Sequence, residues 1–213
     1  MKEYTKIETP FERDMNGSKK LIEGLFRNES VYALANNDWI WTEKVDGTNI
    51  RVHWDGHTVE FGGRTERAQI PAHLVNRLNE LFGGETNAQI FEQLFGDKDV
   101  ILFGEGYGHK IQAVGDKYMK ESVDFVLFDV LIGNLWLKWD AVEEIARPFG
   151  ILTAPVVQRY GSLYDAIEYV KTKPLSLLSN DAPMEGLVLR QPEGMLTRTG
   201  DRIIVKVKAR DFT

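Results

Sequence analysis

Ionisable side chains stand at the ends or in the middle of apolar segments of this 213-residue chain, where a simple core strand would carry none. Glu105 ends one such segment, Glu185 precedes another, Asp129 interrupts a third, and Lys206 and Lys208 alternate with the valines of a fourth. Two lysines at positions i and i+2 of a strand project from the same face, and burying an ammonium without an anion is costly. The lysine pair therefore needs a negative partner, which is either a carboxylate of an internal ion-pair network or a bound phosphate. The alternative is that the two lysines lie on an edge strand and extend their ammonium groups into solvent.

Several common catalytic motifs are excluded. In the run 104–108, Gly-Glu-Gly-Tyr-Gly, the third glycine has the wrong offset for a dinucleotide-binding loop, because His109 occupies the required position. The sequence also lacks a Gly-x-x-x-x-Gly-Lys-Ser/Thr phosphate loop and the Gly-x-Ser-x-Gly and His-Glu-x-x-His motifs. With no cysteine, and no metal-ligand spacing among its four histidines, it offers neither a disulfide framework nor a thiolate zinc site.

The most informative segment is 43–49, Glu-Lys-Val-Asp-Gly-Thr-Asn. On its pattern alone, Asp46-Gly47 predicts a type I′ turn between strands at 39–45 and 48–54. A second Asp-Gly turn at 55–56 leads to a strand at 58–61, so the pattern predicts a three-stranded antiparallel meander. In this interpretation Lys44 is an ordinary strand residue.

Periodicity predicts the other elements. Helical spacing occurs at 18–34 with Ser18 as its cap, and around 74–82, 90–95, 141–149 and 163–170. Strands are expected at 100–103, 125–132, 186–190 and 202–207. Because hairpins and helices are mixed without strict strand–helix alternation, we expect an α+β fold with antiparallel sheets. No linker or repeat divides the chain, so it is treated as one domain.

The composition is that of an ordinary globular protein, with 26 basic and 32 acidic side chains and a formal net charge of −6. This balance argues against coating of nucleic acid by bulk attraction, although Arg198, Arg202, Lys206, Lys208 and Arg210 concentrate positive charge near the C-terminus. The N-terminus shows no signal-peptide pattern and no run is long enough to span a membrane, so we expect an intracellular, cytoplasmic protein without a membrane partner.

The order of the motifs resembles the covalent nucleotidyltransferases, and among them the ATP-dependent RNA ligases of the RNA ligase 2 type. Six segments carry the resemblance: Glu43-Lys44-Val45-Asp46-Gly47, Gly63-Arg64-Thr65, Phe103-Gly104-Glu105-Gly106, Phe128-Asp129, Glu185-Gly186-Leu187-Val188-Leu189-Arg190 and Lys206-Val207-Lys208. The resemblance implies an α+β, ATP-grasp-like nucleotidyltransferase domain of antiparallel sheets flanked by helices. We expect residues 1–213 to form this single adenylyltransferase domain, with no C-terminal accessory domain.

The resemblance also implies roles for individual residues. Lys44 is the nucleophile that takes AMP from ATP, and Lys206 and Lys208 are catalytic contacts of the α-phosphate. The implied nucleotide-binding residues are Glu43, Lys44, Asn49, Arg64, Glu105, Phe128, Glu185, Lys206 and Lys208, with Arg64 and Glu105 at the ribose and the Phe128 ring on adenine. A lysine reacts as its free amine, which neighbouring cations favour. Glu185 is the implied ligand of Mg²⁺ or Mn²⁺.

The implied substrate is RNA with 5′-phosphate and 3′-hydroxyl ends, joined in RNA repair. Thr48-Asn49 favours RNA ligases, because DNA ligases and capping guanylyltransferases typically carry arginine in place of Asn49. Candidate RNA contacts are Asn49 and five arginines, Arg51, Arg190, Arg198, Arg202 and Arg210. For each of these arginines, a solvated surface role is the alternative. Tyr107, His109 and Lys110 either border the site or belong to an ordinary loop.

Two departures from the family pattern leave other functions open. Many relatives carry histidine in place of Asp46, and larger ones continue past the position of Thr213 into a domain that engages the polynucleotide. A separate RNA-binding or end-healing partner could therefore be required. The alternatives are a DNA nick ligase, a capping-type guanylyltransferase, a non-catalytic nucleic-acid-binding relative, and a β-rich adaptor in which Asp46-Gly47 is only a turn.

Overall fold

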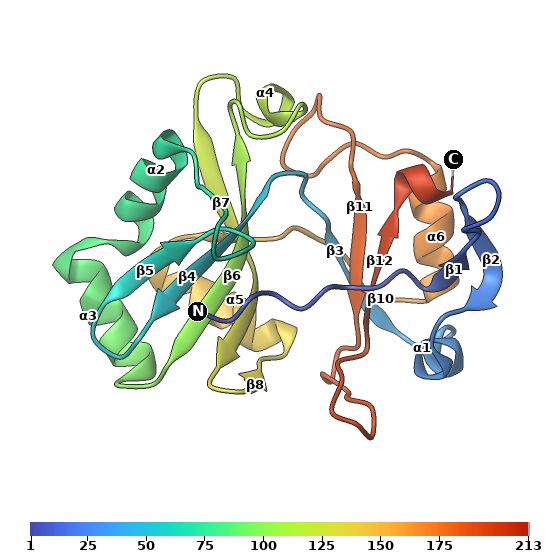
Figure 1. Ribbon diagram of the computed structural model, residues 1–213, viewed down its shortest axis with the longest axis horizontal. Helices are drawn as coiled ribbons and strands as arrows, with labels where there is room; N and C mark the ends of the chain where they lie inside the picture. The colour runs from blue at the N-terminus through green and yellow to red at the C-terminus, as the bar shows by residue number, and fades with distance from the viewer. Residues whose placement is uncertain (213) are drawn as a thin grey trace. The chain divides into compact units, whose positions relative to one another are not determined.

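The computed structural model describes residues 1–212, and Thr213 lies outside the described residues. The fold is α+β, with mainly antiparallel sheets flanked by helices (Figure 1). Its residues form two compact units. Unit 1 comprises 1–5 and 46–154, and unit 2 comprises 6–45 and 155–213.

Unit 1 is built on a sheet with the strand order β5-β4-β6-β7-β8, and β9 pairs with β7 in parallel. The strands are β4 (Thr48–Trp54), β5 (Val59–Gly62), β6 (Val100–Gly108), β7 (Val123–Ile132), β8 (Leu135–Trp136) and β9 (Leu152–Thr153). The helices are α2 (Ala72–Phe82), α3 (Gly84–Phe95), α4 (Gly115–Tyr118) and α5 (Trp139–Phe149).

Helices α2, α3 and α5 of unit 1 pack on one face of its sheet, and α4 packs on the other through the contact between Tyr118 and Tyr107. Ile50, Val52 and Trp54 of β4 are buried on the first of these faces, the helical face, and the Trp54 ring stacks on Phe91 of α3 with a centroid distance of 5.3 Å. Since successive side chains of a strand point to opposite faces, Asn49 and Arg51 lie on the other face. The helical face therefore holds one core, whereas the other face carries polar residues together with a smaller buried cluster of Ile101, Phe103 and Leu131.

Unit 2 is built on a four-stranded sheet with the order β10-β3-β11-β12. Its strands are β3 (Trp39–Glu43), β10 (Val156–Gly161), β11 (Gly186–Arg190) and β12 (Ile204–Lys208), and β1 (Phe11–Arg13) and β2 (Leu21–Phe26) form a separate hairpin. Its helices are α1 (Glu29–Leu34), α6 (Leu163–Lys171) and the 3-10 turn η1 (Ala209–Asp211).

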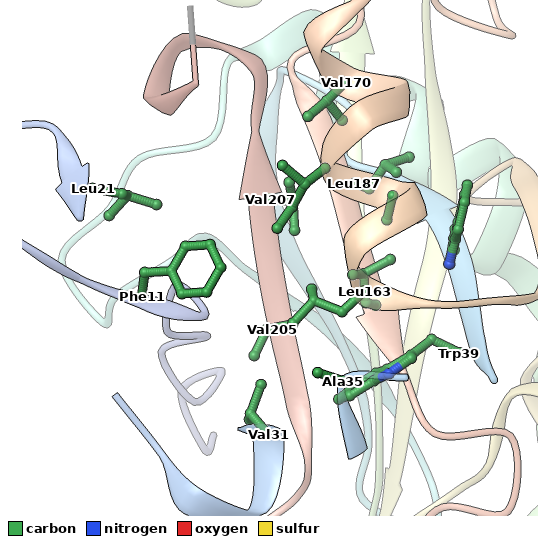
Figure 2. Packing of buried hydrophobic residues seen from close by; sticks show 14 of the residues in the cluster. Phe11, Leu21, Val31, Ala35, Trp39, Leu163, Val170, Leu187, Val205 and Val207 are labelled. Atoms are coloured by element: carbon green, nitrogen blue, oxygen red, sulfur yellow. The ribbon is translucent and has the colours of Figure 1, made fainter. Parts of the chain in front are cut away.

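The core of unit 2 packs against one face of this sheet. Val205 and Val207 of β12 are buried with Leu163 of α6 and Phe11 of β1 in a single apolar cluster (Figure 2). The two valines alternate with Lys206 and Lys208, which are only partly buried. The core therefore fixes the register that turns both lysines to the opposite face.

Two local predictions are wrong. The segment 18–34 forms β2 and α1 rather than one helix, because Gly24 adopts a left-handed φ of 87° and the side chain of Asn28, not Ser18, caps the helix. The predicted meander also fails at its first turn, since β3 and β4 belong to different sheets. The second turn is confirmed, with Gly56 at φ 98° between β4 and β5.

Within residues 1–212, none of the helices has the length and apolar character needed to cross a membrane.

Candidate active site

Three charged residues of unit 2 form a lysine–carboxylate cluster. Lys44 Nζ lies 2.6 Å from Glu185 Oε2, and Lys208 Nζ lies 2.6 Å from Glu185 Oε1. The side chains are 27%, 18% and 14% exposed for Lys44, Glu185 and Lys208, so the cluster is shielded but open to a ligand. One carboxylate thus holds two ammonium groups in place through charge-assisted hydrogen bonds.

The sheet register brings these three residues together. Gly186 pairs with Lys208 across β11 and β12, and the Lys44 N–H donates to the Gly186 carbonyl just beyond β3. A side chain at Gly186 would collide with the carbonyl of Val207, so only glycine permits this close approach. The Glu-Gly motif therefore combines a counter-ion with the backbone space that the pairing requires.

The charges of the cluster shift the ionisation of its members. Burial acts to raise the pKa of Glu185, but the Lys44 and Lys208 ammonium groups outweigh it and the net pKa is lowered. The pKa of Lys206 is lowered, first by burial and then by the charges of Lys208 and Lys44. The predicted lysine pair is therefore part of the same electrostatic environment as Lys44.

Glu43 does not face this cluster, which corrects its predicted nucleotide contact. It pairs in register with the core residue Leu187 and is only 2% exposed. Its carboxylate accepts hydrogen bonds from the Ser176 hydroxyl and from the Leu177 N–H at 2.8 Å. Burial raises the pKa of Glu43 in spite of these two donors. Glu43 instead ties down the segment that leads into Glu185, and no signal in the sequence pointed to Ser176.

In unit 1, Asn49 and Glu105 face each other on the polar side of the sheet, because they are direct partners in the β4–β6 register. Asn49 Oδ1 is buried without a hydrogen-bond partner among residues 1–212, as expected of a group that awaits a ligand. The two glycines beside Glu105 give room to helical-face side chains, since a side chain at Gly104 would collide with Phe125 and one at Gly106 with Leu74.

Phe128 lies at a β-bulge of β7. The register passes from the Phe103–Asp129 pair to the Gly104–Leu127 pair, so Phe128 is the extra residue. Its half-buried ring packs against Tyr4, with a centroid distance of 5.1 Å, and the Tyr4 hydroxyl donates to Asp129 Oδ2 at 2.8 Å. Bulges re-aim side chains and recur beside active sites. The contacts of Tyr4 could not be anticipated from the sequence.

A comparison with protein families matches residues 37–208 to the RNA ligase family. The chain belongs to the RNA ligase family. The matched range contains the whole lysine–carboxylate cluster and the Asn49–Glu105 pair. A comparison with curated proteins gives no match.

Solved RNA ligase structures share the fold. A mutant of Naegleria gruberi RNA ligase with AMP and Mn is 15% identical, with a TM-score of 0.66 over 97% of this chain and 62% of that one. A second mutant, with ATP and Mn, is 16% identical at a TM-score of 0.66 over 99% and 62% of the two chains. The enzyme with PPi is 17% identical at 0.65 over 100% and 63%. The chain thus spans less than two thirds of these relatives, and the likeness shows the fold.

Asp46-Gly47 of this RNA ligase family member is a connection between the two units rather than a hairpin turn. A side chain at Gly47 would collide with the Gly106 carbonyl, so the glycine of the motif is required by close packing on β6. The Gly47 carbonyl accepts a hydrogen bond from Gln112 Nε2 at 3.0 Å, and the Asp46 N–H donates to the Tyr118 hydroxyl at 3.3 Å. Sequence reasoning missed both of these contacts.

The predicted RNA-binding arginines differ in accessibility. Arg51 is 1% exposed and its guanidinium bonds to protein groups, so its predicted contact with RNA phosphates is wrong. Arg190 is 7% exposed on β11, whereas Arg198 and Arg210 are exposed. RNA contacts by Arg190, Arg198, Arg202 and Arg210 stay predictions, as does the role of Arg64, which is exposed just after β5.

The donor set of the cluster fits a divalent cation. Glu185 is kept ionised by its lysine neighbours, and residues 1–212 contain no group of three or more acidic or histidine side chains that could hold a metal ion. Mg²⁺ commonly takes one or two protein carboxylates, with phosphate and water oxygens completing its shell. A single carboxylate, Glu185, is a donor of the kind that this pattern requires.

Proposed function

We propose that this chain is an ATP-dependent RNA ligase in which Lys44 forms a covalent lysyl-AMP intermediate. The observation that carries the proposal is the lysine–carboxylate cluster, in which Lys44 and Lys208 share Glu185 at 2.6 Å within the matched RNA ligase range. Family membership and the ATP, AMP and PPi named in the similar structures support this choice.

In the first step the Lys44 amine attacks the α-phosphorus of ATP. An N–P bond forms, the bond from the α-phosphorus to the bridging oxygen breaks, and pyrophosphate leaves. Nζ gives up one proton before the attack and a second afterwards, so a neutral phosphoramidate nitrogen remains. Lys206 and Lys208 neutralise the phosphate charge that this displacement concentrates. A divalent cation, when bound at Glu185, supplies further charge neutralisation.

In the later steps AMP passes to RNA. An oxygen of the 5′-phosphate end attacks the lysyl-AMP phosphorus, so a P–O bond forms and the N–P bond breaks. The Lys44 nitrogen takes up a proton and leaves as the free amine. A 3′-hydroxyl then attacks the activated 5′-phosphate, so a phosphodiester bond forms and AMP leaves. The residues of unit 1 supply recognition in this proposal, with Arg64 and Glu105 at the ribose, Phe128 on the adenine and Asn49 at the sealing step.

Covalent labelling tests the first step. The intact protein is incubated with ATP or GTP labelled at the α-phosphate and with Mg²⁺ or Mn²⁺, and then denatured and separated by electrophoresis. We expect label from ATP that is absent in Lys44→Ala and retained in Lys120→Ala, an exposed lysine of unit 1. Label from GTP alone would indicate capping chemistry. A folded protein that takes label from neither nucleotide would refute the proposal.

Joining is tested on defined ends. Nicked RNA duplexes and nicked DNA duplexes of equal sequence, each with a 5′-phosphate and a 3′-hydroxyl, are offered to the labelled protein. We expect RNA to be joined in preference to DNA, and a 5′-hydroxyl end to be inert. Preference for the DNA nick would replace RNA ligase by DNA ligase without changing the first step. RNA repair, a cytoplasmic location, the single adenylyltransferase domain and a separate RNA-binding partner stay predictions.

A further inference from the structure

Arg51 is a buried arginine in the middle of β4, which lies between the edge strand β5 and β6. It is 1% exposed, and its register partners are Phe103 on β6 and Gly62 on β5. A buried guanidinium is costly unless its donors are satisfied, and aliphatic residues would fill the same space without that cost. The charge at this position therefore needs a reason other than packing.

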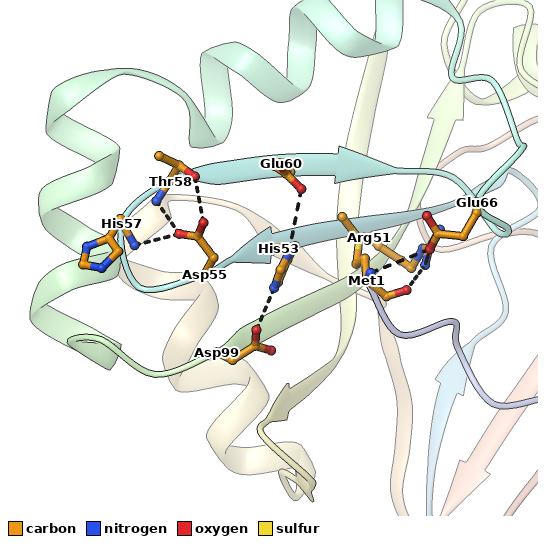
Figure 3. Close-up of polar contacts among 9 residues, drawn as sticks. All are labelled: Met1, Arg51, His53, Asp55, His57, Thr58, Glu60, Glu66 and Asp99. Carbon is orange, nitrogen blue, oxygen red and sulfur yellow. Dashed lines mark hydrogen bonds and ion pairs between the residues drawn. The ribbon is translucent and has the colours of Figure 1, made fainter.

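The guanidinium binds both ends of the segment 63–66, which follows β5. Its Nε donates to the Gly63 carbonyl at 2.7 Å. Its Nη1 donates to Glu66 Oε1 at 2.9 Å and to the Met1 carbonyl at 2.8 Å (Figure 3). A Cβ atom on residue 62 would lie 3.2 Å from Arg51 Nη2, so glycine at this position leaves room for the guanidinium group. The segment is thus held to the sheet at two points.

The contact with Glu66 is a real electrostatic partnership although Glu66 is at the surface. Its hydrogen bond from Arg51, followed by the attraction of the Arg51 charge, lowers the pKa of the Glu66 carboxyl. The carboxylate is 66% exposed while the guanidinium is buried. Arg51 therefore holds the segment 63–66 through two hydrogen bonds, one to the buried Gly63 carbonyl and one to the exposed Glu66 carboxylate.

Arg64 lies between these two fixed points and is itself exposed. We propose that Arg51 is a positioning residue that presets the segment 63–66, so that Arg64 is held ready for the nucleotide. This inference rests on the proposed function, in which Arg64 contacts the ribose of ATP. A long arginine on a loose loop would lose conformational freedom on binding, and holding its backbone in advance reduces that cost.

The first test measures the segment directly. Amide hydrogen exchange of residues 63–66 is compared in the wild type and in Arg51→Lys. Lysine keeps the positive charge but lacks the planar guanidinium, so it cannot make all of these hydrogen bonds at once. We expect exchange at these amides to be at least about tenfold faster in the variant, with the helices of unit 1 unchanged. Unchanged exchange at 63–66 would overturn the inference whether or not the protein takes label from ATP.

The second test asks whether Arg51 acts through Arg64. The ATP concentration giving half-maximal labelling should rise about tenfold in Arg51→Lys and in Arg64→Ala, while the rate at saturating ATP changes less than about twofold. In the double variant the effect should be no larger than in Arg64→Ala alone, because Arg51 has nothing left to position. Fully additive effects would overturn the inference, since they would mean that Arg51 acts independently of Arg64.

Controls separate this inference from stability and from the proposed function. Arg67→Ala, an exposed arginine near the same segment, should leave the half-maximal ATP concentration within about twofold of the wild type. Glu66→Gln should give a smaller rise than Arg51→Lys, because the Gly63 carbonyl still holds the guanidinium. Absence of label in the wild type would refute the proposed function, and the exchange experiment would still decide the inference.

Discussion

The two units differ in how their candidate functional residues are held. In unit 2 the cluster of Lys44, Glu185 and Lys208 is joined by direct ionic contacts of 2.6 Å. In unit 1 the candidates occupy separate strands and loops, and Asn49 Oδ1 has no partner within residues 1–212. The charges differ as well, with 15 basic and 14 acidic side chains in unit 2 against 11 and 18 in unit 1, which add to the 26 and 32 of the chain.

This difference suggests a division of labour. A cluster of opposed charges holds its reactive groups in place before any substrate arrives, which is what electrostatic catalysis requires. The side-chain oxygen of Asn49, which has no hydrogen-bond partner within residues 1–212, is expected to gain one when a ligand binds. We therefore expect substitutions in unit 2 to reduce the rate of labelling, and substitutions in unit 1 to raise the ATP concentration that labelling needs.

The largest effect is expected from Glu185→Ala. The change removes the counter-ion of both lysines and the proposed metal ligand, so labelling at saturating ATP should fall about 1,000-fold. The rate of lysyl-AMP formation measures it. Glu193→Ala, an exposed glutamate of the same unit, is the matched control. If the labelling rate at saturating ATP were unchanged and only the ATP concentration for half-maximal labelling rose, Glu185 would contribute to ATP binding and not to the rate. The two units would then not differ in the way proposed.

Phe128→Ala should show the opposite pattern. Loss of a ring that stacks on a base costs about 1–3 kcal/mol, so the ATP concentration for half-maximal labelling should rise about 10- to 100-fold with little change in maximal rate. Titration of labelling against ATP measures it. Phe128→Tyr, which keeps the ring, should restore most of the affinity. A fall in maximal rate alone would mean that Phe128 supports the sheet rather than the adenine.

The sequence predicted the ionic cluster better than its surroundings. Glu185, Lys206 and Lys208 could be found because charges within apolar strands are expensive and need partners. Most strands and helices with strong periodicity, such as 125–132 and 163–170, were also predictable, because local pattern is enough to define them. The order of the motifs along the sequence carried the resemblance to the family.

Contacts between distant segments were not predictable. β3 pairs with β10 and β11, more than 100 residues away, and this pairing turned a predicted hairpin into a connection between units. Asp46-Gly47 has the sequence of a common turn, but Gly47 is required for close packing on β6 and not for a positive φ. The dipeptide alone does not distinguish these two uses of glycine. For the same reason the partners of Glu43 and Arg51 were missed, since they come from loops whose sequence carries no periodic signal.

Glu43→Gln should lower stability more than activity. The Glu43 carboxylate accepts hydrogen bonds from the Ser176 hydroxyl and the Leu177 N–H, one at each oxygen. Glutamine has only one side-chain oxygen, so one of these buried hydrogen bonds is lost. The free energy of unfolding in urea should fall by about 1–3 kcal/mol. Ser176→Ala is the matched variant from the other side of the contact and should cost a similar amount. A loss of labelling without a loss of stability would return Glu43 to the nucleotide-binding group.

The smallest effect concerns pH and compares two glutamates of unit 2. The pKa of Glu185 is lowered in the folded protein, so its stabilisation is present above the ordinary value of 4.5 and is lost as pH falls through the lowered value. The pKa of Glu43 is raised, so its contribution has the opposite sign and declines as pH rises above 4.5. Urea unfolding between about pH 3 and pH 7 should therefore show a shallower acid decline in Glu185→Gln and a steeper one in Glu43→Gln. If the free energy of unfolding changed with pH equally in both variants, the lysines would not determine the ionisation of Glu185. Glu185 and Glu43 would then not differ electrostatically.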